Sequence, residues 1–152
     1  MTQLWFPKPR IVCERSIRYY YSDEELNKIR CNTLKIGENC FIERSAHLDH
    51  AGGIEIGDNV YINGQCSILT HDMARVVAGL EGLRKPVKIG SRVFVGIKST
   101  ILMGITIGDD VIIGCNSVVT KNIPSGSVWA GNPAVYISSL KEYRDKNKKD
   151  YA

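Results

Sequence analysis

The sequence predicts an all-β protein in which the chain winds as a triangular coil of short strands around one core. Three features of the spacing carry this prediction. An aliphatic residue recurs every six positions, a glycine often follows it directly, and a small or short aliphatic residue often stands four positions after it. A period of six fits neither an α-helix nor one long strand as an open-ended pattern. It fits three strand-and-corner units per turn, and such repeats stack in one dimension.

The aliphatic positions form two series that define about four coils, over residues 36–53, 56–73, 89–106 and 107–124. We expect these side chains, and the small residues four positions later, to point into the prism. The glycines between them are expected to relieve backbone strain at the bends. The aliphatic positions are Ile36, Ile42, Leu48, Ile54, Ile56, Ile62 and Ile68, then Ile89, Val95, Ile101, Ile107, Ile113 and Val119; the small ones are Cys40, Ala46, Val60, Cys66, Val93, Ser99, Val111 and Ser117.

Two irregularities interrupt the repeat. Ile54 and Glu55 read as two extra residues, after which the count restarts at Ile56. The register is lost again after Thr70-His71-Asp72-Met73 and returns at Ile89, which predicts an extruded loop over about residues 72–86. Function tends to gather where a regular scaffold breaks, so this second interruption is the first place to look for a site.

The repeat region is expected to span residues 34–137, between two caps that close the ends of the stack. Residues 1–33 are expected to form an N-terminal cap segment, because Ser22-Asp23-Glu24-Glu25 has the pattern of a capping box that opens a short helix through about Arg30. A polar helix is expected from Ile137 to Lys149, so residues 138–152 form a C-terminal helix and tail.

Composition excludes several classes of function. With 152 residues, 43% hydrophobic and 24% charged, the chain predicts one folded domain. A net charge of +4 suits a phosphorylated small ligand but is too low to indicate nucleic-acid binding. The sequence has no apolar run long enough for membrane insertion. Its five Cys lack a CxxC pair, so neither a disulfide framework nor a zinc knuckle is expected, and a cytoplasmic location is the default.

The repeat, together with the segments Ile113–Pro124 and Trp129-Ala130-Gly131-Asn132-Pro133-Ala134, resembles the hexapeptide-repeat acyltransferases. The stretch Asp49–Val60 followed by Thr70-His71-Asp72 looks closest to maltose or galactoside and surface-polysaccharide sugar O-acetyltransferases. The resemblance covers residues 34–137. It implies a left-handed parallel β-helix, acetyl-CoA as co-substrate without a metal, a small sugar-like acceptor, and a homotrimer with active sites between subunits.

The resemblance also implies that His71 is the general base. An imidazole suits this task because its ordinary pKa lies near neutral pH, so it takes a proton from the acceptor hydroxyl or amine as that atom attacks the thioester. Its second ring nitrogen needs a partner, for which the adjacent Asp72 is poorly placed. Asp49, His50 and Asn63 are candidate contacts to the acceptor.

Six residues are candidate contacts to acetyl-CoA by the same resemblance. The positions after glycine in two successive coils would contact the pantetheine arm, and a slim arm pairs with backbone groups much as a strand does. A Lys near the nucleotide end offers a cation to a phosphate, although an ordinary turn lysine is an equal interpretation. The candidates are Ile97, Cys115, Thr120, Lys121, Ala130 and Gly131.

Two other functions remain open at this point. A γ-class carbonic anhydrase needs three His on zinc, and this chain has three His but lacks the paired spacing of that family. A non-catalytic assembly module would predict an unbroken prism without the break at His71. Among acetyltransferases, serine, xenobiotic and sugar-nucleotide enzymes usually carry domains or loops that this sequence does not show.

Overall fold

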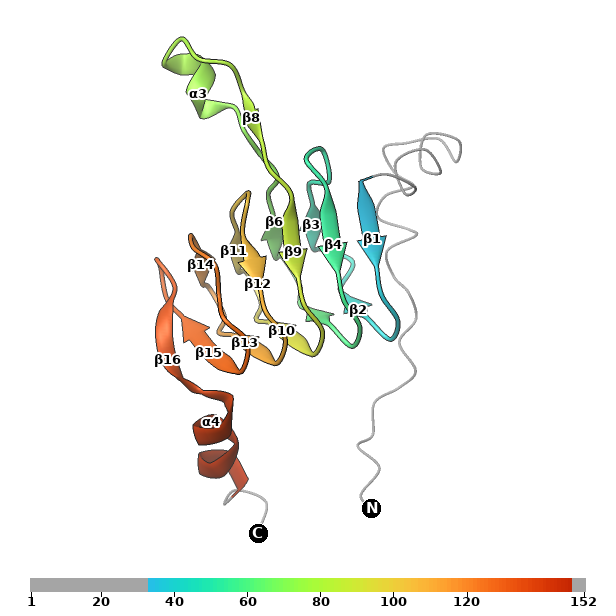
Figure 1. The fold of residues 1–152 in the computed structure, drawn as a ribbon, viewed down its shortest axis with the longest axis vertical. Coiled ribbons are helices and arrows are strands. Elements are labelled where there is room, and N and C mark those ends of the chain that lie inside the picture. Colours follow the sequence, from blue (N-terminus) through green and yellow to red (C-terminus); the bar gives the residue numbers. More distant parts are fainter. Residues whose placement is uncertain (1–32, 149–152) are drawn as a thin grey trace.

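The computed structural model describes residues 33–148, and in it the chain winds through three sheets that form the sides of a prism and are parallel except at the last strand of one of them (Figure 1). The first sheet contains β1 (Leu34–Ile36), β4 (Ile54–Ile56), β9 (Val87–Ile89) and β12 (Thr106–Ile107). The second contains β2 (Phe41–Ile42), β5 (Tyr61–Ile62), β10 (Val93–Val95), β13 (Val111–Ile113), β15 (Ser127–Ala130) and β16 (Val135–Ser139). The third contains β3 (His47–Leu48), β6 (Ser67–Ile68), β11 (Thr100–Ile101) and β14 (Val118–Val119).

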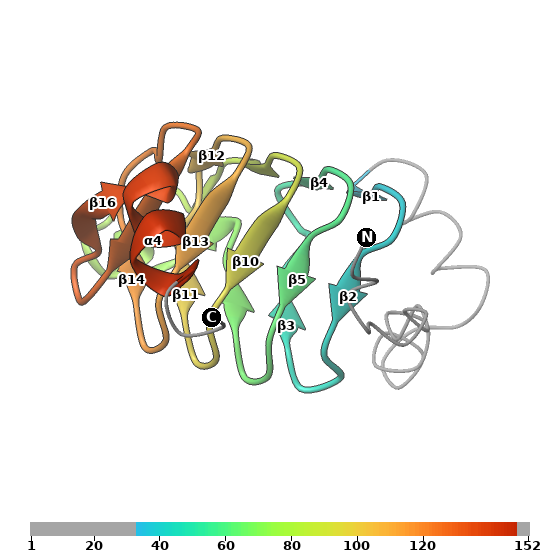
Figure 2. The ribbon, with the colours of Figure 1, turned by 90° about the horizontal axis from the view of Figure 1, so that it is seen from below.

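Four coils stack side by side, and a partial fifth follows through Ile123 and β15 (Figure 2). The all-β fold of about four coils is thus confirmed. The N-terminal cap expected over residues 1–33 lies outside the described residues apart from Thr33. No helix within residues 33–148 is long and apolar enough to cross a membrane.

The aliphatic repeat builds the core, as the spacing predicts. Equivalent residues stack in register, for example Ile68 on Ile101 and Ile101 on Val119, and each is almost fully buried. Burying one such side chain stabilises a fold by roughly 1.5–3 kcal/mol, so a column of them holds neighbouring coils together. The small residues four positions later point inward too. Cys66, Ser99 and Ser117 are buried, and their side chains donate to the backbone carbonyls of corner glycines.

The corners turn for a different reason from the one expected. The residue three positions after each of seven core aliphatics has a left-handed backbone, with φ between 54° and 61°. These residues are Asn39, Asn59, Gln65, Arg92, Lys98, Asp110 and Asn116. The glycine directly after the aliphatic is needed for close approach between coils instead. A Cβ on Gly57 would lie 2.8 Å from the carbonyl carbon of Gly90 in the next coil.

The two-residue slip also lies elsewhere. Ile54 and Glu55 are not extra residues, because they pair with Leu34 and Lys35 within the first sheet. The additional length falls in the preceding corner, between the end of β3 at Leu48 and the start of β4. This corner, residues 49–53, is therefore longer than its counterparts.

The extruded segment is more ordered than a loop. It is an arm, residues 71–84, in which β7 (His71–Asp72) pairs antiparallel with β8 (Leu83–Arg84) below a single helical turn, α3 (Ala74–Val77). The arm projects far beyond the coils (Figure 1). Its tip exposes apolar side chains, with Val77 93% exposed.

The C-terminal helix begins later than predicted. Residues 137–139 belong to β16, which pairs antiparallel with β15, and the helix α4 runs over Leu140–Asn147. Ser139 sets this boundary, because its hydroxyl accepts from the Glu142 N–H while the Glu142 carboxylate accepts from the Ser139 N–H. The capping box displaces the helix start from Ile137 to Leu140.

Candidate active site

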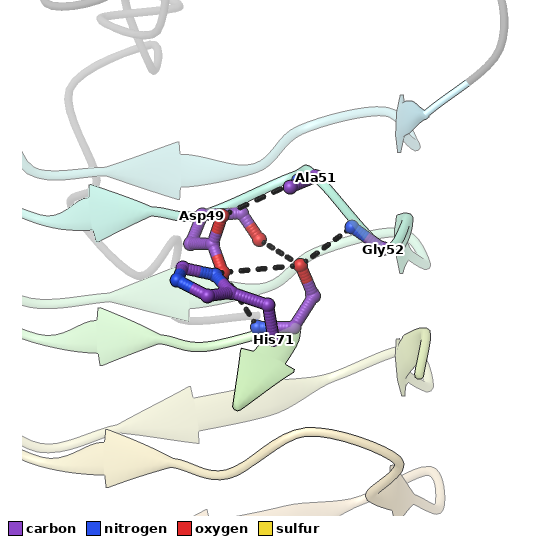
Figure 3. A network of polar contacts seen from close by, with 5 residues as sticks. Asp49, Ala51, Gly52 and His71 are labelled. Carbon is purple, nitrogen blue, oxygen red and sulfur yellow. Dashed lines mark hydrogen bonds and ion pairs between the residues drawn. The ribbon is translucent and has the colours of Figure 1, made fainter. Parts of the chain in front are cut away.

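His71 stands where the chain leaves the coil, at the first residue of the arm. Its side chain is 41% exposed, and its Nδ1 lies 2.5 Å from Asp49 Oδ2 (Figure 3). Asp49 belongs to the long corner after β3, one coil away. The partner of this imidazole nitrogen is therefore Asp49, which the pairing of β3 with β6 places beside residues 69–70.

The Asp49 carboxylate is held by three groups. It accepts from the Thr70 N–H (2.9 Å to Oδ2), the Ala51 N–H (3.3 Å to Oδ1) and His71. Partial burial raises the pKa of Asp49, but these hydrogen bonds outweigh that effect and hold the pKa below its ordinary value. Asp49 is thus ionised at neutral pH.

An ionised carboxylate fixes the tautomer of a neutral His71. Because a carboxylate can only accept, Nδ1 carries the hydrogen and Nε2 keeps its lone pair. The side of the ring away from Asp49 is consequently a proton acceptor. This is the arrangement that a general base needs.

Thr70 ties the site to the core. Thr70 is fully buried. Its hydroxyl donates to the Asp49 carbonyl (2.6 Å) and accepts from the Gly52 N–H (2.7 Å). One side chain therefore fixes both ends of the corner that carries Asp49. Thr70 was not among the residues predicted for the site. The signal that could have found it is the repeat itself, because the pairing of Leu48 with Ile68 places Asp49 beside residues 69–70.

The other two acceptor candidates lie in different surroundings. His50 is half-buried, and its Nδ1 lies 3.4 Å from Thr33 Oγ1. Asn63 stands at the corner before β6, whereas His71 follows β6, and its side-chain amide donates to the Val95 carbonyl (2.8 Å). The structure brings Asp49 to His71 but does not bring Asn63 there.

The cofactor candidates fall on two edges of the third sheet. Ile97, Cys115 and Gly131 stack in successive coils along the edge where the strands begin, and we call them the ridge. Thr120 and Lys121 lie at the other edge, just past the end of β14. Thr120 lies five positions after Cys115, so the two edges are at most about 17 Å apart. The six candidates therefore lie at two different corners of the prism.

The ridge offers what a pantetheine arm needs. Ile97 and Cys115 are exposed, Gly131 has no side chain, and within residues 33–148 the backbone N–H groups of Ile97 and Cys115 have no acceptor. Ala130, half-buried, precedes Gly131. Ile97 still presents its backbone, although its side chain supplies no hydroxyl.

Lys121 and the cysteines have definite surroundings. Lys121 Nζ lies 5.7 Å from the centre of the Trp129 ring, a cation–π distance, so this lysine has a structural contact as well as an exposed charge. Cys40 and Cys66 are buried, as predicted, and burial raises the pKa of both thiols. No group of three His, Cys, Asp or Glu side chains in the described part of the chain is arranged to hold a metal ion.

Comparison with known proteins adds to this picture. A family model described as the hexapeptide repeat of succinyl-transferase matches residues 33–64 and 86–121, on both sides of the arm. The galactoside O-acetyltransferase of Escherichia coli (strain K12) is 33% identical over 76% of this chain and 69% of its own length. A serine acetyltransferase of Helicobacter pylori (strain ATCC 700392 / 26695) is 31% identical over 80% of this chain and 71% of its own.

Solved structures show the same similarity in three dimensions. A galactoside acetyltransferase in complex with coenzyme A is 26% identical, with a TM-score of 0.64, over 89% of this chain and 84% of that one. These relatives share the fold along most of the chain, and they differ in the acceptor that their names state.

Proposed function

The chain belongs to the hexapeptide-repeat acetyltransferases, a family with a left-handed parallel β-helix and acetyl-CoA as co-substrate, and from this premise we propose that it acetylates a hydroxyl of a sugar-like acceptor with His71 as the general base. The observation that carries the proposal is the contact between Asp49 and His71, because it leaves Nε2 as a proton acceptor.

The transfer needs no covalent enzyme intermediate. The acceptor oxygen attacks the thioester carbonyl carbon while Nε2 of His71 takes its proton. The tetrahedral intermediate then collapses, the carbon–sulfur bond breaks, and the thiolate of coenzyme A takes the proton back from the imidazolium. Asp49 keeps the ring oriented and stabilises its positive charge during this cycle. Asp49 thus acts as a positioning residue rather than as a contact to the acceptor.

We assign the remaining residues by their places. The ridge of Ile97, Cys115 and Gly131, with Ala130 beside it, would hold the pantetheine arm through backbone groups. Lys121 and Thr120 would lie near the phosphates. Because the ridge and this pair occupy different edges of the third sheet, we propose that they contact one acetyl-CoA from two neighbouring chains of a homotrimer.

The acceptor side of the site is the long corner. His50, next to Asp49, stays a candidate contact to the acceptor. We assign Asn63 a structural role instead, because its amide donates to the Val95 carbonyl. The galactoside relatives support a sugar. We place the reaction in the cytoplasm, where acetyl-CoA is made available, and in the synthesis of a surface polysaccharide.

Serine is the second candidate acceptor. The similarity to a serine acetyltransferase covers as much of this chain as the similarity to the galactoside enzyme. A hydroxyl of serine would meet the same base.

Acceptor profiling of the purified protein separates these possibilities. Acetyl-CoA is supplied with galactosides, maltose, L-serine or chloramphenicol, and free coenzyme A thiol is followed over time. We expect release with sugars and only background release with serine. Faster release of coenzyme A with serine than with sugars would show that the acceptor is an amino acid and not a sugar. Absence of release and of acetyl-CoA binding by calorimetry would favour the assembly module.

A further inference from the structure

A second charged side chain lies beside His71, and it comes from the returning strand of the arm. In the β7–β8 ladder His71 is directly opposite Arg84. The Lys85 N–H bonds to the Thr70 carbonyl (2.9 Å), which makes residues 70 and 85 a hydrogen-bonded pair. The next pair, His71 and Arg84, is therefore of the closely spaced kind, with both side chains on one face of the ladder and Cβ atoms about 4.5–5.5 Å apart.

Arg84 has no counter-ion among the residues that the structure describes, 33–148. It is exposed, and no carboxylate among residues 33–148 forms an ion pair or hydrogen bond with it. The two acidic residues beside His71 have other partners: Asp49 contacts His71 and its own corner, and Asp72 accepts from the Ala74 N–H (2.9 Å). A guanidinium in this position has a full set of donors to offer to an incoming group.

The geometry points to an acceptor that carries an anionic group, a carboxylate or a phosphate, bound by Arg84 while its hydroxyl faces His71. A guanidinium matches both anions through two parallel hydrogen bonds, which would orient the acceptor as well as hold it. The phosphates of acetyl-CoA do not fit this place. The thioester must stand at Nε2, and the whole pantetheine arm separates it from the phosphates.

This inference rests on the proposed function of His71 and narrows its substrate class. The anion has two possible sources, an acidic sugar or an amino acid such as serine, and we commit to the acidic sugar. Arg84 would then set the preference for charged over neutral sugars, and it would leave the chemical step itself to His71.

The test compares acceptors that differ in charge but share their hydroxyls. Galactose 1-phosphate is paired with methyl galactoside, and methyl galacturonoside with its methyl ester; L-serine is a separate arm. Values of kcat/KM are measured for the wild type, Arg84→Gln and Arg84→Lys. Arg44→Gln is the control, because it removes the same charge from an exposed corner after β2, away from His71.

We expect the wild type to prefer the charged member of a pair by roughly 10- to 100-fold, the range of a hydrogen-bonded ion contact. Arg84→Gln should abolish this preference and leave kcat/KM for the neutral sugar and the binding of acetyl-CoA unchanged. Arg84→Lys should keep part of the preference, and Arg44→Gln should keep all of it. Sugars acetylated without charge preference would overturn the role of Arg84 alone. Transfer only to serine, lost in Arg84→Gln, would overturn the sugar and uphold the anion contact.

Discussion

At the residue scale, His71 and Asp49 have different roles in the proposed site. The histidine is half in solvent, where it can meet an acceptor, and the carboxylate is nearly covered, at 11% side-chain exposure. In the proposed mechanism, Asp49 fixes the tautomer of the ring and His71 moves the proton. Loss of either should therefore have a distinct signature.

Replacing His71 by alanine should remove turnover without removing the fold. General base catalysis contributes about 10²- to 10⁴-fold, so kcat of His71→Ala should fall by that range. Acetyl-CoA binding, measured by calorimetry, should stay at the wild-type level. His47→Ala is the matched control, since His47 is exposed on β3, and it should retain near wild-type kcat. Turnover by His71→Ala close to wild type would refute the assignment of the base.

Asp49 should give the fold a dependence on pH of known sign. Its pKa in the folded chain lies below the ordinary 3.8, so the unfolded chain binds the proton more readily. The stabilisation by the carboxylate is therefore complete above the ordinary value and is lost as the pH falls through the lower, folded value. The difference in free energy of unfolding between wild type and Asp49→Asn, from urea titrations, should narrow as pH drops from 6 towards 3. A gap that widens on acidification contradicts this linkage.

At the element scale, the corner is the unit that the sequence predicted least well. The aliphatic spacing identified the strands, because burial repeats every six residues. The spacing could not show that the glycine is required by the close approach of the neighbouring coil. Nor could it show that the residue with a left-handed backbone lies two positions after that glycine. Nor could it place the slip, because Ile54 and Ile56 are both buried and either could keep the count. The contact between Asp49 and His71 depends on side-chain directions in an irregular corner, which the spacing of the aliphatic residues does not encode.

A pair of substitutions in one corner tests this account. Gly57→Ala would push a Cβ against the Gly90 backbone and should cost about 1–3 kcal/mol, as overpacking does. Asn59→Gly, two positions on, removes a side chain from a left-handed backbone with φ 57° and should be neutral or slightly stabilising. Urea unfolding measures both. Equal destabilisation by the two changes would be inconsistent with the corner described.

The ends of elements were set by contacts that spacing alone does not encode. The arm forms a hairpin because residues on either side of α3 pair, and its sequence lacks the alternation that would reveal two strands. The start of α4 follows from Ser139 and Glu142, a local signal that the polar run after Ile137 obscured.

At the scale of the whole molecule, the proposed trimer makes a direct prediction. Light scattering should give a mass near three times the 16.9 kDa of one chain. Variants His71→Ala and Cys115→Trp, the second blocking the ridge, should each be inactive alone. Mixed trimers formed by co-expression should regain turnover, because one interface then combines an intact His71 with an intact ridge. A lack of recovery in mixed trimers would place the whole site within one chain.

The antiparallel strand β16 has a consequence for how the molecule ends. A stack of parallel coils presents, at its last turn, an edge that could template another molecule's first coil and so propagate a fibre. β16 reverses direction on β15, and α4 continues from it. The second sheet thus closes with a strand of the wrong polarity for a further coil. The same reversal that brings the chain to its C-terminal helix disfavours head-to-tail polymerisation along this side of the prism.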